Sequence, residues 1–491
     1  MWLKWKTLPS MFGESDDSGD DATAWARSRS PTSREGAMVA TSSSGIAAPP
    51  RVETSSASDH LARSTEWHAW LLEFMGPRKA TWGRQSRKLI VESMFTGMNP
   101  MAFCLAQGGM DFDDRVGAER KPHAHQFMRQ NNILPKQCYT EAKSMMTVAL
   151  AHSQSGYVRS DFFTAGFPCQ PYSMQPRRAL APHEHPLFDC ADLTFEYILR
   201  TRPRVALLEN TTRFLDHPSG LPALQKKLES CYHIGWAKMN LKVWLDVARP
   251  RAYLWLIAKD IGTSEDCLAV HENIRLVEAS RPDKFRARVE DFMFAPGSDE
   301  WRRKVIPLQC RGGSAVSRAE AITKGEEKAL QHYDPKEKVA MGRLRGLRAT
   351  PRQQAMFQAL VAARCLAQRC ATSDAAAVAD AVKGFKWDFS QNLPAKSKES
   401  FKSSVQGPMG CMLRSSVPFS FEHDRVILAE EIIRSHGWQM GAMVPDCSGI
   451  REVDVRDLAG EMQAIQSISV VMWAVMAAVG DKLEGLFVPD R

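Results

Sequence analysis

Short runs of apolar residues alternate with amphipathic stretches along the middle of the chain. Residues 187–199 carry apolar side chains at helical spacing, as expected of a helix that lies on a sheet. Uninterrupted apolar runs are instead typical of strands that are buried on both faces of a parallel sheet. Residues 205–208 and 252–258 are such runs, and residues 88–95 and 161–165 are largely apolar and are predicted as strands too. The alternation predicts an α/β fold.

The first of these units, residues 88–119, has the order strand, turn, helix, strand. Its second strand, predicted over residues 115–119, ends in the acid Glu119. This order is typical of a dinucleotide-type unit, in which the turn lets backbone approach a ligand and the acid binds ribose hydroxyls.

The two ends of the chain differ in composition. Residues 10–64 are rich in Ser, Thr, Asp, Ala and Gly, so they cannot bury enough apolar surface to offset the entropy of ordering. We therefore predict a disordered leader over residues 1–66. Order is expected to begin with an apolar helical face made by Trp67, Trp70, Leu71 and Phe74. The most apolar run, residues 468–479, is too short to cross a bilayer and predicts a buried helix.

The first six residues lack the apolar core of a secretory signal, which predicts a nuclear or cytoplasmic location and no membrane partner. The chain has 11 cysteines, an odd number without paired CxxC spacing. This pattern argues against a disulfide framework or a zinc ribbon and favours a reducing compartment without a bound metal.

From residue 263 to about residue 440 the strand–helix alternation stops, which predicts a separate, irregular domain. Residues 301–400 contain 19 Lys and Arg against 9 Asp and Glu, within a chain of net charge +8. Such an excess fits a polyanionic partner, although a solvated basic surface explains it equally well.

One cysteine differs from the others in its surroundings. Cys169 lies in the octapeptide GFPCQPYS, residues 166–173, directly after a predicted strand, and Pro168 and Pro171 stiffen the loop. A thiol on a rigid loop at a strand end can be held against a ligand, which is the position expected of a catalytic thiolate.

This octapeptide resembles the catalytic loop of the cytosine-C5 DNA methyltransferase family, GFPCQPFS, with Tyr172 as the one departure. The resemblance implies a Rossmann-like methyltransferase domain that uses S-adenosyl-L-methionine, with a smaller target-recognition domain. It assigns residues 67–262 to the catalytic domain, 263–440 to target recognition, and 441–491 to a C-terminal helix that completes the catalytic domain.

The resemblance also implies a cofactor site. Residues 93–100 are similar to the family's glycine-rich turn, and residues 459–461 to its C-terminal AGN element. By this resemblance the cofactor-binding residues are Phe95, Gly97, Glu119, Glu141, Pro168 and Gly460. Asn99 and Pro100 replace two family glycines, and Ser93 replaces an acid, which predicts a weaker pocket.

The implied catalytic residues are Cys169, Glu209 and Arg251. Glu209 follows an apolar strand in a segment, ENT, that resembles the family's ENV. Arg251 matches the first arginine of the family's QxRxR element, where Arg249 stands at the glutamine position and Tyr253 at the second arginine.

These residues predict a methyltransferase that acts on cytosine C5 in DNA. Covalent addition of the Cys169 thiolate to C6 would activate C5, and the target base would be flipped out of the duplex. Two alternatives remain open: the same chemistry on RNA, and a catalytically degenerate relative that binds nucleic acid. The oligomeric state is not addressed by any pattern in the sequence.

Overall fold

The computed structural model describes residues 57–75, 84–153, 158–172, 185–305, 351–390, 405–414, 416–439, 444–483 and 487–488. Most of the expected leader, residue Ser173 of the cysteine loop and residues 306–350 of the basic stretch lie outside the described residues.

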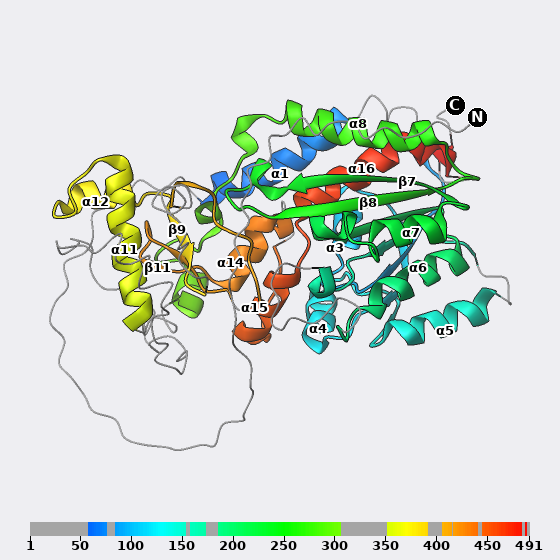
Figure 1. The fold of residues 1–491 in the computed structure, drawn as a ribbon, viewed down its shortest axis with the longest axis horizontal. Helices are drawn as coiled ribbons and strands as arrows, with labels where there is room; N and C mark the ends of the chain where they lie inside the picture. Colours follow the sequence, from blue (N-terminus) through cyan, green and yellow to red (C-terminus); the bar gives the residue numbers. More distant parts are fainter. Residues whose placement is uncertain are drawn as a thin grey trace, which may run out of the picture.

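A sheet forms the centre of the larger part of the molecule (Figure 1). It has seven strands in the order β4-β3-β2-β5-β6-β8-β7. The strands are β2 (Leu89–Met94), β3 (Phe112–Ala118), β4 (Gln137–Tyr139), β5 (Phe162–Ala165), β6 (Val205–Asn210), β7 (Tyr232–Asn240) and β8 (Pro250–Ala258). In this described sheet β8 is antiparallel to both of its neighbours, β6 and β7, and all other neighbouring strands are parallel. All four predicted apolar strands are present, and the predicted Rossmann-like α/β fold is confirmed.

Helices cover both faces of this sheet, which explains why its central strands β5 and β6 are buried along almost their whole length. Along β6, Val205 and Leu207 join one core, whereas Ala206 and Leu208 join the other. The first core is covered by α1 (Ala57–Phe74), α3 (Pro100–Gln107), α4 (Pro122–Gln130), α8 (Ser264–Ser280) and α16 (Ile465–Val479). The second is covered by α5 (Ala142–Ser153), α6 (Asp189–Thr201) and α7 (Leu221–Leu228).

Helix α1 starts earlier than the sequence predicts. Trp67 and Leu71 are buried in the core, as expected from their spacing. However, residues 57–66, which the composition assigns to the leader, form the first turns of the same helix. Once an apolar face is anchored, each added residue gains a hydrogen bond at low cost, so the helix continues N-terminal to Trp67.

Helix α16 is the buried helix predicted from the apolar run near the C-terminus. Among the described helices none is by itself long and apolar enough to cross a membrane, although the bent pair of Glu452–Glu461 with Ile465–Lys482 meets the criteria of length and composition.

Helix α8 follows the domain boundary expected at residue 262. It nevertheless packs against α16 and β7, because Val270, Ile274 and Val277 are buried.

A smaller part lies beside the sheet (Figure 1). It contains α11 (Pro351–Gln368), α12 (Ala375–Ala381) and an antiparallel sheet of β9 (Lys386–Asp388), β10 (Pro418–Ser420) and β11 (Arg425–Val426) around its own apolar core. The chain then returns through α14 (Ala429–Ile433) and α15 (Glu452–Glu461) to α16. Segment 409–414 runs along the edge of the larger part, where Val247 and Met409 form a parallel bridge.

Candidate active site

The cysteine loop leaves the sheet at the point where the strand order changes direction. The chain progresses outward from β2 to β4 on one side and from β5 to β7 on the other, so the turn after β2 and the loop after β5 flank one crevice. Ligands of open α/β sheets bind at such a switch point.

Hydrogen bonds hold the loop in place. Asn210 Nδ2 donates to the carbonyl of Phe167 at 3.1 Å, and the backbone N–H of Tyr172 donates to the carbonyl of Cys169 at 2.9 Å. The Tyr172 ring packs edge-on against Phe214, and its hydroxyl donates to the carbonyl of Ser219 at 3.4 Å. The departure from the family's phenylalanine therefore adds a hydrogen bond without disturbing the packing.

The three predicted catalytic residues come together at this edge of the sheet. Glu209 lies near the end of β6, where it pairs in register with Tyr253 of β8. Arg251 lies two residues earlier on β8, hence on the same face, and its Nε is 3.0 Å from Glu209 Oε1. Both charged groups are near enough to Cys169 to change its ionisation.

The electrostatics of the cysteine reflect opposing influences. Burial raises the pKa of the Cys169 thiol above its usual value, the positive charges of Arg251 and Arg249 lower it, and Glu209 and Cys411 raise it further. The pKa of the Arg251 guanidinium is raised despite its burial, because Cys411, Glu209 and Cys169 favour the positive charge. In the free protein Cys169 is therefore mainly a thiol.

Two further residues of this cluster, Cys411 and Gln463, were not identified as site residues from the sequence. Cys411 Sγ accepts hydrogen bonds from Arg249 Nη1 and Arg251 Nη2, each at 3.4 Å. Gln463, between α15 and α16, lies beside Gly166: a methyl group at Gly166 would collide with the Gln463 amide and lie 3.7 Å from Glu209 Oε2. Cys411 and Gln463 carry no local signal, because they reach the site from segments more than 150 residues away.

The turn after β2 forms the other side of the crevice. Phe95, Gly97 and Asn99 all have positive φ, of 54°, 57° and 57°. The Glu119 carboxylate accepts hydrogen bonds from the backbone N–H of Gly97 at 2.8 Å and of Lys121 at 2.9 Å. A side chain at Gly97 would meet no atom within 4 Å, so the turn opens onto free space beside a carboxylate.

Asn99 and Pro100 explain how this turn forms without the family's glycines. Asn tolerates the left-handed conformation better than other residues with a Cβ, and Asn99 Oδ1 caps α3 by accepting from the N–H of Ala102. Its Nδ2 donates to Asp114 Oδ2 at 2.6 Å and to the carbonyl of Ile133 at 2.7 Å. Pro100 occupies the first turn of α3, where no N–H donor is needed.

The remaining predicted cofactor residues lie in different surroundings. Pro168 is half-buried in the cysteine loop, and Glu141 is exposed at the start of α5. Gly460 of α15 packs directly on the backbone of Leu413 and Arg414, where a Cβ would collide. Its lack of a side chain thus permits close approach of α15 to segment 409–414.

Ion pairs strengthen this contact between segments. Asp457 and Glu461 of α15 both pair with Lys121, which follows β3, and with Arg414. They link the cofactor side of the sheet to segment 409–414.

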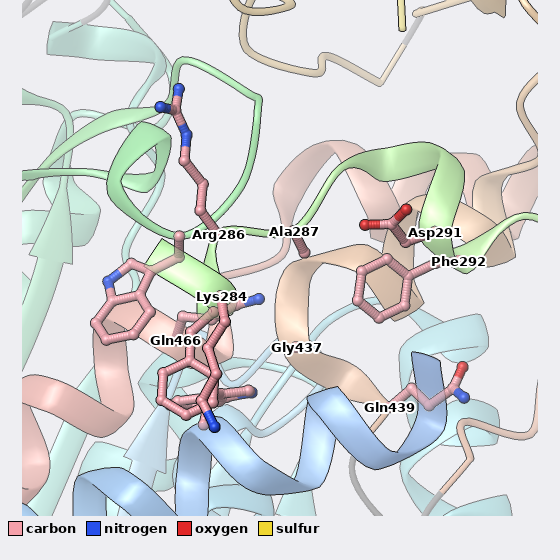
Figure 2. Close-up of a pocket in the computed structure, with 11 residues that line it drawn as sticks. Lys284, Arg286, Ala287, Asp291, Phe292, Gly437, Gln439 and Gln466 are labelled. Atoms are coloured by element: carbon pink, nitrogen blue, oxygen red, sulfur yellow. The ribbon is translucent and has the colours of Figure 1, made fainter. Parts of the chain in front are cut away.

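A small pocket lies elsewhere, between α1, the segment after α8 and the start of α16 (Figure 2). Its walls include Trp67, Trp244, Phe285 and Gln466, with Lys284 and Arg286 beside them. None of the predicted site residues lines it. Within the described ranges, no group of three or more His, Cys, Asp or Glu side chains could hold a metal ion.

The crevice and its two loops belong to a Rossmann-like α/β domain. Residues 89–263 match the family model described as C-5 cytosine-specific DNA methylase. This segment includes Cys169, Glu209 and Arg251. The family predicted from the cysteine loop is therefore the one whose model matches this segment.

Among solved structures, the chain is similar to Dnmt2 methyltransferase of S. pombe, with 12% identity, 79% of this chain and 98% of that chain covered, and a TM-score of 0.42. It is also similar to a candidate DNA modification methyltransferase encoded within an E. coli prophage (13% identity, 80% and 99% covered, TM-score 0.43). A third is the Entamoeba histolytica methyltransferase EhMeth (9% identity, 79% and 98% covered, TM-score 0.41). No curated protein sequence matches the chain significantly.

Proposed function

We propose that this protein transfers a methyl group from S-adenosyl-L-methionine to C5 of a flipped cytosine in DNA. The observation that carries the proposal is the convergence of Cys169, Glu209 and Arg251 on one edge of the sheet, with Arg251 Nε 3.0 Å from Glu209 Oε1. The family match supports methyl transfer to cytosine C5. DNA as the substrate and the covalent adduct belong to the proposal.

The residues around the β2 turn fit S-adenosylmethionine. Gly97 faces open space, and Glu119 is held beside it by two backbone N–H groups, which leaves lone pairs for ribose hydroxyls. The half-buried ring of Phe95, in its left-handed turn, offers an apolar surface for a base. When bound, this cofactor supplies an electrophilic methyl group on a sulfonium centre.

The chain's own residues make C5 reactive. In this proposal Cys169 loses its thiol proton to a base, its Sγ adds to C6, and the electron pair of the C5–C6 double bond moves to C5, which then takes the methyl group. Glu209 supplies a proton to ring N3 as the negative charge develops and takes it back once C5 is methylated, and Arg251 holds the ring oxygen. A base then removes the C5 proton, the electron pair restores the double bond, and Cys169 leaves.

The substrate is proposed as DNA because the strongest motif match is to the DNA-methylating family. C5 cannot be reached inside a duplex, so the base must leave the stack. The basic stretch within residues 301–400, most of which lies outside the described residues, would contact phosphates.

A covalent trap tests the proposal. DNA with fluorine at C5 of its cytosines should form a denaturant-resistant adduct with the full chain in the presence of S-adenosylmethionine, because fluorine cannot leave as a proton does. Cys169→Ser should abolish the adduct. Glu209→Gln should slow trapping by about 10²- to 10⁴-fold while binding persists, since it removes only a proton donor.

Matched controls separate the alternatives. Cys231→Ser, a half-buried cysteine away from the site, should trap like the wild type. Tritium from labelled S-adenosylmethionine should enter DNA and not tRNA. Label in tRNA alone would show that the substrate is RNA. DNA binding without either an adduct or label would instead identify a degenerate binding relative.

A further inference from the structure

The substitution of Arg249 for the family's glutamine creates an electrostatic problem in this chain. Arg249 is only 4% exposed, and the positive charge of a buried guanidinium must be balanced. The nearby carboxylate of Glu209 is already paired with Arg251. Arg249 Nη2 donates to the carbonyl of Met462, which satisfies a hydrogen but adds no negative charge.

Cys411 lies where that missing charge is needed. The parallel bridge of Val247 with Met409 is anchored by two backbone hydrogen bonds, from Ala248 N–H at 2.7 Å and from Met409 N–H at 3.1 Å. Two residues further along both segments, this register brings Cys411 beside Arg249, with Sγ 3.4 Å from Arg249 Nη1 and from Arg251 Nη2.

We propose that Cys411 is a positioning residue that, as a thiolate, balances Arg249 and holds both guanidinium groups against Glu209 and Cys169. A neutral thiol would donate to the carbonyl of Met412, 3.5 Å away, and would accept only weakly from the two arginines. A thiolate accepts strongly from both and supplies the negative charge. The effect of Cys411 on catalysis rests on the proposed function, but the ionisation of Cys411 does not.

The surrounding charges favour this arrangement. Although burial opposes ionisation, Arg249 and Arg251 together lower the pKa of Cys411 below its usual value. His436, packed near the same arginines, has a pKa lowered to about 3 by burial, so it is neutral and adds no charge. Arg414 on the same segment is engaged by Asp457 and Glu461.

The two thiols of the site therefore share one negative charge, which resides on Cys411 in the free protein. Because the Cys411 charge raises the pKa of Cys169, removing it should make Cys169 more acidic. Arg251 then has Nε on Glu209 and Nη2 on Cys411, so both its position and its orientation are determined.

Thiol ionisation provides the first test, without cofactor or nucleic acid. The full chain is alkylated with iodoacetamide across a pH series, and the Cys169 and Cys411 peptides are quantified by mass spectrometry. Cys411→Ser should lower the pH midpoint of Cys169 alkylation by about one unit. Arg249→Gln should raise the midpoint of Cys411. The control Cys231→Ser should change neither.

Rescue provides the second test. At a pH that ionises Cys169 in every variant, Cys411→Ser should lower kcat about tenfold, because Arg249 is left unbalanced beside Arg251. The double variant R249Q/C411S, which restores the family's glutamine, should return to within about threefold of wild type. If Cys411 had a purely structural role, the kcat losses of the single variants Arg249→Gln and Cys411→Ser would simply multiply in the double variant.

Unchanged Cys169 and Cys411 midpoints in the single variants would overturn the inference, as would multiplying losses in the double variant. If the midpoints shift as stated but no methyl group enters DNA or RNA, the proposed function fails and the thiolate assignment stands.

Discussion

Asp114 is a carboxyl group that β3 holds almost out of contact with water, at 9% exposure. Burial raises its pKa to about 7, Asn99 opposes that shift through its hydrogen bond, and the negative charges of Asp113 and Glu92 add to it. Between its ordinary pKa and about 7, the folded protein therefore binds more protons at this site than the unfolded chain does. Stability should fall as the pH rises through this range.

Asp114→Asn should remove this dependence while keeping an oxygen that accepts from Asn99 Nδ2. Relative to wild type, the variant should gain about 2–4 kcal/mol in free energy of unfolding between pH 4 and pH 8. Urea denaturation at both pH values measures the difference. Asp111→Asn, at an exposed ion pair, is the control and should follow wild type. Parallel curves for wild type and Asp114→Asn would contradict the assignment.

Phe95 and Glu119 permit a prediction about the cofactor. Phe95→Ala should weaken S-adenosylmethionine binding about tenfold, because it removes apolar area on the base. Glu119→Ala should weaken it at least as much, since Gly97 N–H also loses its acceptor. Titration calorimetry measures both, with Trp236→Ala on the exposed face of β7 as a control. If both variants bound S-adenosylmethionine with wild-type affinity, the cofactor site would have to lie elsewhere.

At the scale of elements, the β2 turn and helix α3 depend on Asn99. This one side chain caps the helix, tolerates a φ of 57° and bonds Asp114 and the Ile133 carbonyl. These roles connect β2, α3 and the loop before β4. The turn is therefore specified by a polar side chain where the family uses backbone flexibility.

Asn99→Ala should destabilise the protein by about 2–4 kcal/mol, from the lost cap, the unsatisfied partners and the left-handed backbone. Asn99→Gly loses the same bonds but has no Cβ, so it should be about 1 kcal/mol more stable than Asn99→Ala. Thermal or urea unfolding of the two variants gives this difference. Equal stabilities would show that the positive φ costs nothing at this position.

At the scale of the whole molecule, three distant segments meet around the crevice. Lys121, Arg414 and the acids of α15 form one ion-pair cluster, and Gly460 lets α15 touch segment 409–414. The crevice is thus complete only when the C-terminal helices return to the sheet. In the proposed function, basic residues within residues 301–400 contact the phosphates of a nucleic acid.

Nucleic-acid binding by the full chain should therefore depend strongly on salt. If six or more phosphates are neutralised, affinity should fall by about 10³-fold or more between 50 and 200 mM salt, because counterions are released. Fluorescence anisotropy with labelled duplex DNA measures the slope. A binding constant that stays flat over this range would rule out the electrostatic role of the basic stretch.

The sequence by itself determined the strands and the loop that carries the thiol. Apolar runs such as 205–208 specify buried strands because every residue of such a strand faces one of two cores, and Cys169 was recognisable because its neighbours are contiguous. The positions of Glu209 and Arg251 followed from the same local motifs. The chain's departures from the family pattern were visible too, but their meaning was not.

Tertiary structure alone decided how those departures are accommodated. Asn99 replaces a glycine through bonds to Asp114 and Ile133, and Arg249 replaces a glutamine beside Cys411, 162 residues further along the chain. Gln463 and Gly460 likewise acquire their surroundings only when α15 and α16 return to the sheet. The physical reason is that charge balance and close packing depend on distance in space, which neither residue spacing nor hydrophobic period encodes.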